Sequence, residues 1–275
     1  MLKESFILNN GISIPKLALG TWQVQNDVAI TAVKDALSVG YRHIDTVSAY
    51  QNEIGVGIAI KESNIPRSKI FVTSKVPAEM KSYAEAKEVI DVSLSKLNLD
   101  YIDLMLIHAP KPWPEMFGGG TKAYFEENLA VWRALEEAYI DGKLKAIGIS
   151  NFDVNDIQNI MENGTIKPHV NQIRVHIGHV PTDVIKCCED NDILVQAFSP
   201  NATGRLIGNE SIEAMAKKYN VTIPQLAIRF DLQLGLLPIP KTTHIEYMIS
   251  NSEIDFTIAD EDMDILMKVP EIKNF

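Results

Sequence analysis

Cysteine, positive charge and long apolar runs are all scarce in this sequence of 275 residues. Its two cysteines, Cys187 and Cys188, are adjacent, and because a disulfide between neighbours is strained we expect two reduced thiols. No run of about 18 apolar residues occurs, which excludes a membrane-spanning helix. The 36 acidic residues outnumber the 26 basic ones and are spread along the chain, which argues against a nucleic-acid surface.

Targeting segments and linkers are also missing. Residues 1–15 lack the apolar stretch of a signal peptide, and they predict two short strands around Asn10 and Gly11. We therefore expect a cytoplasmic protein. No Pro/Gly/Ser-rich linker interrupts the chain, and an apolar share of 46% is enough for a substantial core, so residues 1–275 are predicted to form one domain.

Short apolar runs alternate with amphipathic helical patterns through the whole chain. The runs expected to form buried strands are 16–21, 41–45, 69–75, 101–108, 144–151, 169–175, 193–199 and 236–241. Such alternation is typical of a parallel sheet covered by helices. Eight units in a chain of this length favour a closed (β/α)8 barrel, with an open doubly wound sheet as the alternative. In a barrel, functional residues lie at the carboxyl ends of the strands.

Three neighbouring predicted strands end in an acid, a base and an imidazole, namely Asp45, Lys75 and His108. Tyr50 follows Asp45 by five residues, before a helix that begins near Asn52. Taken singly, each has an ordinary explanation, such as a half-buried aromatic, a solvated charge or a core histidine. Their common position at one rim of the barrel indicates chemistry instead.

Together these four residues suit the protonation of an oxyanion. The reference pKa of a tyrosine, about 10, is too high for efficient proton transfer at neutral pH, and we expect the Lys75 cation to lower it. Asp45 would hold Lys75 in place, and His108 would orient a carbonyl oxygen. These side chains supply no hydride, so carbonyl reduction would need a cofactor.

The pattern for a nicotinamide site is not the Rossmann one. The stretch 55–60, "GVGIAI", has two of the three glycines of G-x-G-x-x-G but lies inside a helical pattern. Polar groups at later strand ends can bind a carboxamide instead: Ser150, Asn151 and Gln172. The ring of Phe198 can stack on the nicotinamide.

Several segments resemble the aldo-keto reductase superfamily, most of all its bacterial diketogulonate-reductase-like members. They are "GTWQV", "GYRHIDTVSAYQNE", "FVTSKV", "LDYIDLMLIHAP", "LKAIGISNF", "VNQIRVH", "QAFSP" and "LPIPKTT", in order over nearly the whole chain. The resemblance implies a monomeric (β/α)8 TIM barrel with an N-terminal β-hairpin closing the bottom. It also implies NADPH extended across the top.

The resemblance assigns roles by position. It implies that the catalytic tetrad is Asp45, Tyr50, Lys75 and His108, and that the carboxamide contacts are Ser150, Asn151 and Gln172. It places Phe198 where a tyrosine usually stacks on the nicotinamide, and it implies adenosine-phosphate contacts from Lys241 and Thr242 and an adenine contact from Asn251. The expected substrate pocket includes Trp22 and Trp113.

Departures from the family pattern concern the cofactor and the pocket. Tyr247 stands where the family usually has an arginine for the 2′-phosphate, which leaves Lys241, with Thr242 or His244, and keeps NADH possible. A short loop after strand seven and a short C-terminal tail suggest a wide pocket. We expect breadth across small aldehydes, diketones or sugar-derived ketones.

Two other readings remain open. His43 and Asp45 alternate on a strand and His176 precedes His179, as in barrel hydrolases that bind metals. A nicotinamide-binding sensor or scaffold of the same fold is the second. The favoured hypothesis is an NAD(P)H-dependent oxidoreductase without a metal, in which Tyr50 protonates an aldehyde or ketone oxygen. Its partners would be small carbonyl substrates, with no nucleic acid and no membrane.

Overall fold

Eight parallel strands form a sheet that closes on itself in residues 1–273, the part of the chain that the structure describes. In this computed structural model each strand is hydrogen-bonded to its neighbour in sequence. The strands are β3 (Leu19–Gly20), β4 (His43–Asp45), β5 (Phe71–Val76), β6 (Ile102–Ile107), β7 (Leu144–Ser150), β8 (Val170–Arg174), β9 (Leu194–Phe198) and β10 (Leu237–Ile239). The ring closes where Gly20 bridges to Lys241 and its amide donates to the Pro240 carbonyl at 2.9 Å. The predicted (β/α)8 barrel is confirmed, and the open sheet is wrong.

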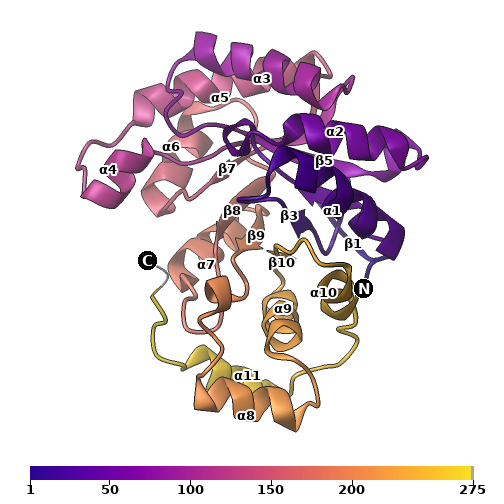
Figure 1. Cartoon of the computed structure of the whole chain (residues 1–275). Coiled ribbons are helices and arrows are strands. Elements are labelled where there is room, and N and C mark those ends of the chain that lie inside the picture. Colours follow the sequence, from indigo (N-terminus) through magenta and orange to yellow (C-terminus); the bar gives the residue numbers. More distant parts are fainter. Residues whose placement is uncertain (274–275) are drawn as a thin grey trace.

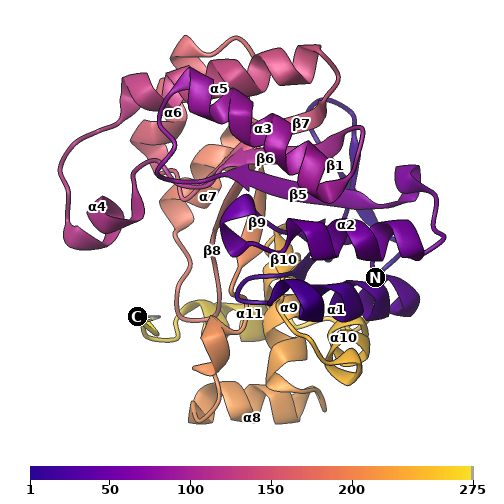
Figure 2. The ribbon, with the colours of Figure 1, turned by 45° about the horizontal axis from the view of Figure 1, so that its top comes forward.

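Helices surround this barrel on its outer side (Figure 1). They are α1 (Asn26–Val39), α2 (Glu53–Glu62), α3 (Tyr83–Leu97), α4 (Trp113–Gly118), α5 (Phe125–Ile140), α6 (Val154–Asn163), α7 (Thr182–Asp190), α8 (Glu210–Lys218), α9 (Ile223–Gln233), α10 (Ile245–Ser252) and α11 (Asp260–Met267). Short 3₁₀ turns are η1 (Ser48–Tyr50), η2 (Arg67–Lys69) and η3 (Ala202–Gly204). Figure 2 shows α1, α2 and α3 side by side on one flank, and α10 packs against α1, so the helical layer also comes round to its start.

An N-terminal hairpin lies at the opposite end of the barrel from the strand ends that carry the predicted site. Its antiparallel strands are β1 (Ser5–Ile7) and β2 (Ser13–Pro15). The Asn9 amide donates to the carbonyls of Pro168 and Asp192, and the Asn10 amide donates to the carbonyl of Lys145. These carbonyls lie at the amino ends of β8, β9 and β7. The hairpin therefore closes the bottom of the barrel, as predicted.

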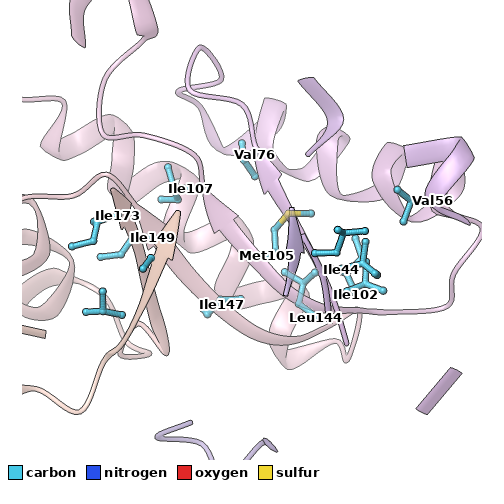
Figure 3. Packing of buried hydrophobic residues seen from close by; sticks show 14 of the residues in the cluster. Ile44, Val56, Val76, Ile102, Met105, Ile107, Leu144, Ile147, Ile149 and Ile173 are labelled. Carbon is cyan, nitrogen blue, oxygen red and sulfur yellow. The ribbon is translucent and has the colours of Figure 1, made fainter. Parts of the chain in front are cut away.

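The barrel strands divide their side chains between two apolar layers, because successive residues of a strand point to opposite faces. On β6, Leu104 and Leu106 belong to the inner layer, whereas Met105 and Ile107 pack under the helices. Figure 3 shows Met105, Ile107 and Ile149 within this outer layer. The inner layer becomes polar toward the carboxyl ends of the strands, and that change marks the site.

The two glycines of the "GVGIAI" stretch serve helix packing. A Cβ atom on Gly55 would lie 2.1 Å from the Asn26 carbonyl oxygen, and one on Gly57 would lie 2.2 Å from that of Leu97. Both glycines lie on α2 and let its backbone approach α1 and the end of α3. Their role is therefore close contact between helices, which agrees with the rejection of a Rossmann loop.

Other sequence predictions have mixed outcomes. Cys187 and Cys188 are free thiols on α7, as expected. Within residues 1–273, none of the helices combines the length and the apolar character needed to cross a bilayer. The predicted domain extends to Phe275, and its last two residues lie outside the described part, so single-domain organisation stays a prediction.

Candidate active site at the carboxyl ends of the strands

A buried ion pair forms the base of the site. Lys75 Nζ donates to Asp45 Oδ1 at 2.7 Å and to the carbonyl oxygen of Thr46 at 3.1 Å. Only 1% of Lys75 and 4% of Asp45 is exposed. The register of β4 and β5 brings the two residues to the same rim, since both point into the barrel near the ends of adjacent strands. The structure thus joins the two charges that the sequence placed on neighbouring strands.

Tyr50 reaches this pair on the short turn η1. Lys75 Nζ lies 5.7 Å from the centre of the Tyr50 ring, and the ring centre of His108 lies 6.2 Å away. Asn52 holds the connection rigid, because its side-chain amide donates to the carbonyls of Thr21 and Val24 at 3.0 Å. Its Oδ1 also accepts from the Thr46 hydroxyl at 2.6 Å.

Sequence reasoning took Asn52 only as the start of a helix. It does precede α2, but its side chain makes no cap hydrogen bond there. Its partners, Thr21, Val24 and Thr46, lie 6 to 31 residues away in the sequence, so no local sequence pattern identifies Asn52 as a bracing residue. Asn52 is fully buried and braces the segment that carries Tyr50.

The protonation state of Tyr50 differs from the prediction. Desolvation raises the pKa of Tyr50 above its ordinary value, and the Asp45 carboxylate adds to the rise. The predicted net lowering of the Tyr50 pKa is wrong for this geometry, because desolvation and the Asp45 carboxylate outweigh the Lys75 cation, which is itself paired with Asp45. Tyr50 is therefore a neutral phenol that holds a proton to give.

His108 is also neutral. Burial lowers the pKa of His108 to about 3, and the Lys75 and Lys81 cations act in the same direction. The edge of Trp113 packs against its ring at 4.9 Å between centres, which places this predicted pocket residue beside the tetrad. His108 Nδ1 is enclosed without a hydrogen-bond partner among the described residues, so Nε2 is the nitrogen left to meet a carbonyl oxygen.

The three predicted carboxamide residues form a connected group next to the tetrad. The Ser150 hydroxyl donates to the Gln172 carbonyl at 2.8 Å, and the Asn151 amide donates to Ser150 Oγ at 3.1 Å and to the His108 carbonyl at 2.9 Å. Gln172 Nε2 donates to Asp45 Oδ2 at 2.7 Å. These residues are therefore coupled to the tetrad by direct hydrogen bonds.

The other predicted cofactor residues follow the last two barrel strands. Phe198 is half-buried at the end of β9, and Lys241 is exposed just after β10. Thr242 is buried and its hydroxyl accepts from the His244 amide at 3.1 Å, while Asn251 is buried on α10. Among residues 1–273, no hydrogen bond or ion pair joins these residues to the tetrad, which is consistent with an elongated ligand that reaches from one group to the other.

Two aromatic residues of the prediction lie on the surface: Tyr247, at the position of the family's usual arginine, and Trp22, an expected pocket residue. Tyr247 is 57% exposed on α10 and packs its ring edge against His244. Trp22 is 39% exposed and directly follows Thr21, whose hydroxyl donates to the Asp45 carbonyl at 2.9 Å. Tyr247 therefore lies on the surface beside His244, and Trp22 lies on the surface next to a residue that is hydrogen-bonded to Asp45.

A second anchor, not predicted from the sequence, holds the segment after His108. Lys81 Nζ donates to the Ala109 carbonyl at 2.7 Å and to Asn128 Oδ1 at 2.9 Å, and the Asn128 amide donates to the Pro110 carbonyl at 3.0 Å. Burial lowers the pKa of Lys81 to about 8. Lys81 and Asn128 thus hold the two backbone carbonyls that follow His108.

The histidines on which the metal hypothesis depended have partners within the protein. His43 is fully buried with Nε2 at 2.9 Å from the Thr73 hydroxyl, and burial lowers its pKa to about 3. His176 Nδ1 lies 2.9 Å from the carbonyl of Ile177, and its ring packs against His179. Among residues 1–273, no three His, Cys, Asp or Glu side chains are grouped so as to hold a metal ion.

A neutral phenol, a neutral imidazole and a buried Lys–Asp pair lie together at the rim of a (β/α)8 barrel, an arrangement that suits an enzyme donating a proton to an oxygen. Comparison with known proteins gives the family. The Aldo/keto reductase family model matches residues 16–271, so the chain belongs to that family and is an oxidoreductase. Neither the metal hydrolase nor the sensor reading is favoured by this membership.

Relatives and solved structures agree with this assignment. Glyoxal reductase of Bacillus subtilis (strain 168) is 40% identical over 265 residues, which cover 96% of this chain and 91% of the relative. The aldo-keto reductase MGS-M4, from a deep-sea metagenome library of the Medee basin, has a TM-score of 0.90 at 40% identity, covering 97% of this chain and 95% of its own. An aldo-keto reductase of the silkworm Bombyx mori, solved with NADPH, has a TM-score of 0.86 at 30% identity, covering 99% of this chain and 88% of its own.

Proposed function

We propose that this protein is an NADPH-dependent reductase of small aldehydes and ketones. The observation that carries the proposal is the neutral Tyr50 phenol beside the buried Lys75–Asp45 pair and the neutral His108. The Bacillus subtilis relative, named a glyoxal reductase, supports small dicarbonyls as the first substrates to try.

The donors and acceptors at the rim fit a nicotinamide cofactor. Ser150, Asn151 and Gln172 present hydroxyl and amide groups that match a carboxamide, and Phe198 offers an aromatic face. Lys241, exposed after β10, would meet an adenosine phosphate, and Thr242 and Asn251 would add contacts to the phosphate and the adenine. When bound, the reduced nicotinamide supplies the hydride.

The residues of this chain supply the other half of the reaction. His108 Nε2 holds the carbonyl oxygen by donating a hydrogen bond, which favours negative charge on that oxygen. Tyr50 then transfers its phenol proton to the oxygen, and the Lys75 ammonium stabilises the phenolate that remains. Asp45 keeps Lys75 charged and in place. The raised pKa of Tyr50 keeps the phenol protonated throughout the neutral range, so the proton is present on Tyr50 when the carbonyl is bound.

Replacing Tyr50 by phenylalanine tests the proposal. The variant Tyr50→Phe should bind NADPH as the wild type does but reduce glyoxal at least about 100-fold more slowly, because general acid catalysis contributes about 10²–10⁴-fold. NADPH oxidation at 340 nm and fluorescence titration with NADPH measure the two quantities. Tyr83→Phe, on the outer helix α3, is the matched control and should leave both unchanged. Near-normal turnover in Tyr50→Phe would refute the role of Tyr50.

Two features bear on the proposed preference for NADPH over NADH, and they act in opposite directions. A Bombyx mori structure with NADPH supports it, whereas Tyr247 in place of the usual arginine weakens the grip on the 2′-phosphate. We expect kcat/KM to favour NADPH, and we expect Tyr247→Arg to increase that preference by adding a bidentate phosphate donor. Steady-state rates with both cofactors measure it, and a strong NADH preference in the wild type contradicts it.

We also propose a monomeric state, which the family resemblance implies, and a cytoplasmic location. Light scattering after size exclusion should give the mass of one chain over a range of concentrations. A mass of two chains that persists on dilution would contradict the monomer.

A further inference from the structure

Two buried glutamines lie side by side inside the barrel, directly under the predicted cofactor site. Gln172 on β8 and Gln196 on β9 are register partners in the parallel sheet. Their exposed fractions are 4% and 0%. Gln172 Nε2 donates to Gln196 Oε1 at 2.9 Å and to Asp45 Oδ2 at 2.7 Å. Gln196 is therefore linked to the tetrad through one intervening side chain.

The partners of Gln172 determine which way its amide group is turned. Asp45, in an ion pair with Lys75, offers only acceptor oxygens, so the Gln172 atom that faces it must be the nitrogen. That nitrogen has a second N–H, and Gln196 Oε1 accepts it. With both N–H groups used on these two acceptors, the carbonyl oxygen Oε1 of Gln172 is the atom left to accept from a ligand.

Gln196 accepts this hydrogen bond while, in the described part of the chain, its own amide N–H groups stay unsatisfied. Its own Nε2 is buried and has no hydrogen-bond partner among the described residues. A leucine or methionine would fill the same space on β9 without burying an unsatisfied N–H group. The only hydrogen bond of the Gln196 side chain in residues 1–273 is the one that it accepts from Gln172. The presence of an amide at position 196 is thus explained by the hydrogen bond that it accepts from Gln172.

We propose that Gln196 is a positioning residue that holds the Gln172 amide with its carbonyl oxygen toward the site, where this oxygen accepts from the NH₂ of the nicotinamide carboxamide. This inference rests on the proposed cofactor site. Because the same Gln172 nitrogen also holds Asp45, one hydrogen-bond network joins carboxamide recognition to the carboxylate that anchors Lys75. Without Gln196, one N–H of Gln172 is unsatisfied and Asp45 alone holds the amide, so the direction of its carbonyl oxygen is less narrowly defined.

A cofactor analogue that lacks the carboxamide NH₂ tests this directly. In the 3-acetylpyridine analogue of NADP⁺, the carbonyl attached to the pyridine ring is kept and the NH₂ is replaced by CH₃. The hydrogen bond to Gln172 Oε1 is therefore lost. We expect the wild type to bind NADP⁺ about tenfold more tightly than the analogue, since a hydrogen bond to a buried acceptor is worth about one factor of ten. Fluorescence titration of the whole protein with each compound gives the two dissociation constants.

Variants at Gln196 separate positioning from packing. In Gln196→Met the preference for NADP⁺ should fall to within about threefold. Gln196→Glu keeps an oxygen that accepts from Gln172 and should keep the preference, because any added charge acts equally on the two cationic rings. Gln158→Met, at an exposed position on α6, is the matched control and should leave the preference unchanged.

The outcomes distinguish the two levels of the proposal. A full tenfold preference in Gln196→Met, in a variant whose thermal unfolding matches the wild type, would overturn the role of Gln196 and leave the proposed function standing. Loss of the preference in both Gln196→Met and Gln196→Glu would also overturn it, since packing alone would then explain the effect. A wild type that binds NADP⁺ without any preference over the analogue would refute the carboxamide contact itself. A wild type that binds neither compound would refute the proposed function.

Discussion

The buried pair of Lys75 and Asp45 affects the free energy of unfolding in two opposite ways. Each charge is removed from water, and each is compensated by the other and by a further hydrogen bond, from Lys75 to the Thr46 carbonyl and from Gln172 to Asp45. Removing one partner leaves the other as a buried charge without compensation, which is more costly than removing both.

The variant Lys75→Met is therefore expected to lose about 3–5 kcal/mol of unfolding free energy, as well as activity. The double variant Lys75→Met/Asp45→Asn should recover much of that stability while staying inactive. Urea denaturation followed by circular dichroism measures both. Lys186→Met removes an exposed ion pair with Asp190 on α7 and should cost less than about 1 kcal/mol. A double variant no more stable than the single one would contradict this account.

At single residues, the sequence predicted which four side chains lie together but not the protonation of Tyr50. Asp45, Lys75 and His108 were identifiable because each follows a strand, and strand ends of a parallel barrel meet at one rim. The pKa of Tyr50 was predicted to fall and instead rises. Its direction depends on how far burial outweighs the neighbouring charges, and neither quantity can be read from spacing along a chain.

At the scale of elements, strand alternation sorts functional from structural positions. On β5, Thr73 and Lys75 point into the barrel, whereas Ser74 points outward and its hydroxyl donates to Glu53 at 2.7 Å. The same alternation brings Gln172 and Gln196 to the inside of β8 and β9. The sequence singled out Gln172 but not Gln196, because the latter lies in the middle of an apolar strand where only its neighbour gives it a role.

Helix α9 carries a group that the reaction does not use. Asp231 is fully buried, and neither of its carboxylate oxygens has a hydrogen-bond partner among the described residues. Desolvation raises its pKa well above 3.8. Because the folded-state pKa lies above the unfolded one, the favourable contribution of neutral Asp231 is fully present below pH 3.8 and is lost as the pH rises.

Asp231→Asn keeps the shape of the side chain and removes this titration. The variant should be more stable than the wild type at pH 7, by about 1–3 kcal/mol, and the difference should shrink toward pH 4. Thermal and urea unfolding at both pH values measure it. A variant less stable than the wild type at pH 7 would show that the Asp231 carboxylate has a favourable partner.

At the scale of the whole molecule, buried neutral histidines make the fold sensitive to acid. Burial lowers the pKa values of His43 and His108 to about 3 and that of His176 to about 4. An unfolded histidine has a pKa near 6.5, so unfolding takes up protons between pH 6.5 and about 3–4. The stability from these groups is complete above pH 6.5 and is lost as the pH falls through that window.

We therefore expect the unfolding free energy to fall between pH 6.5 and pH 4.5, by about 2–3 kcal/mol for each buried histidine. His43→Gln should reduce the slope of unfolding free energy against pH by the equivalent of one proton. Urea denaturation at intervals of half a pH unit measures the slope. An unchanged slope in His43→Gln would mean that this ring is protonated in the folded protein.

The sequence by itself determined the barrel and the location of its site. Periodicity depends on local geometry, since strands and helices expose their apolar faces at fixed intervals, and eight repeated units in a chain of this length favour a closed barrel over an open sheet. The tertiary structure alone decided which side chains meet across the barrel, such as Gln196 with Gln172 and Asn52 with Thr21, and which way the pKa of Tyr50 moves. Contacts between remote segments and the loss of water around a group arise only when the chain has folded.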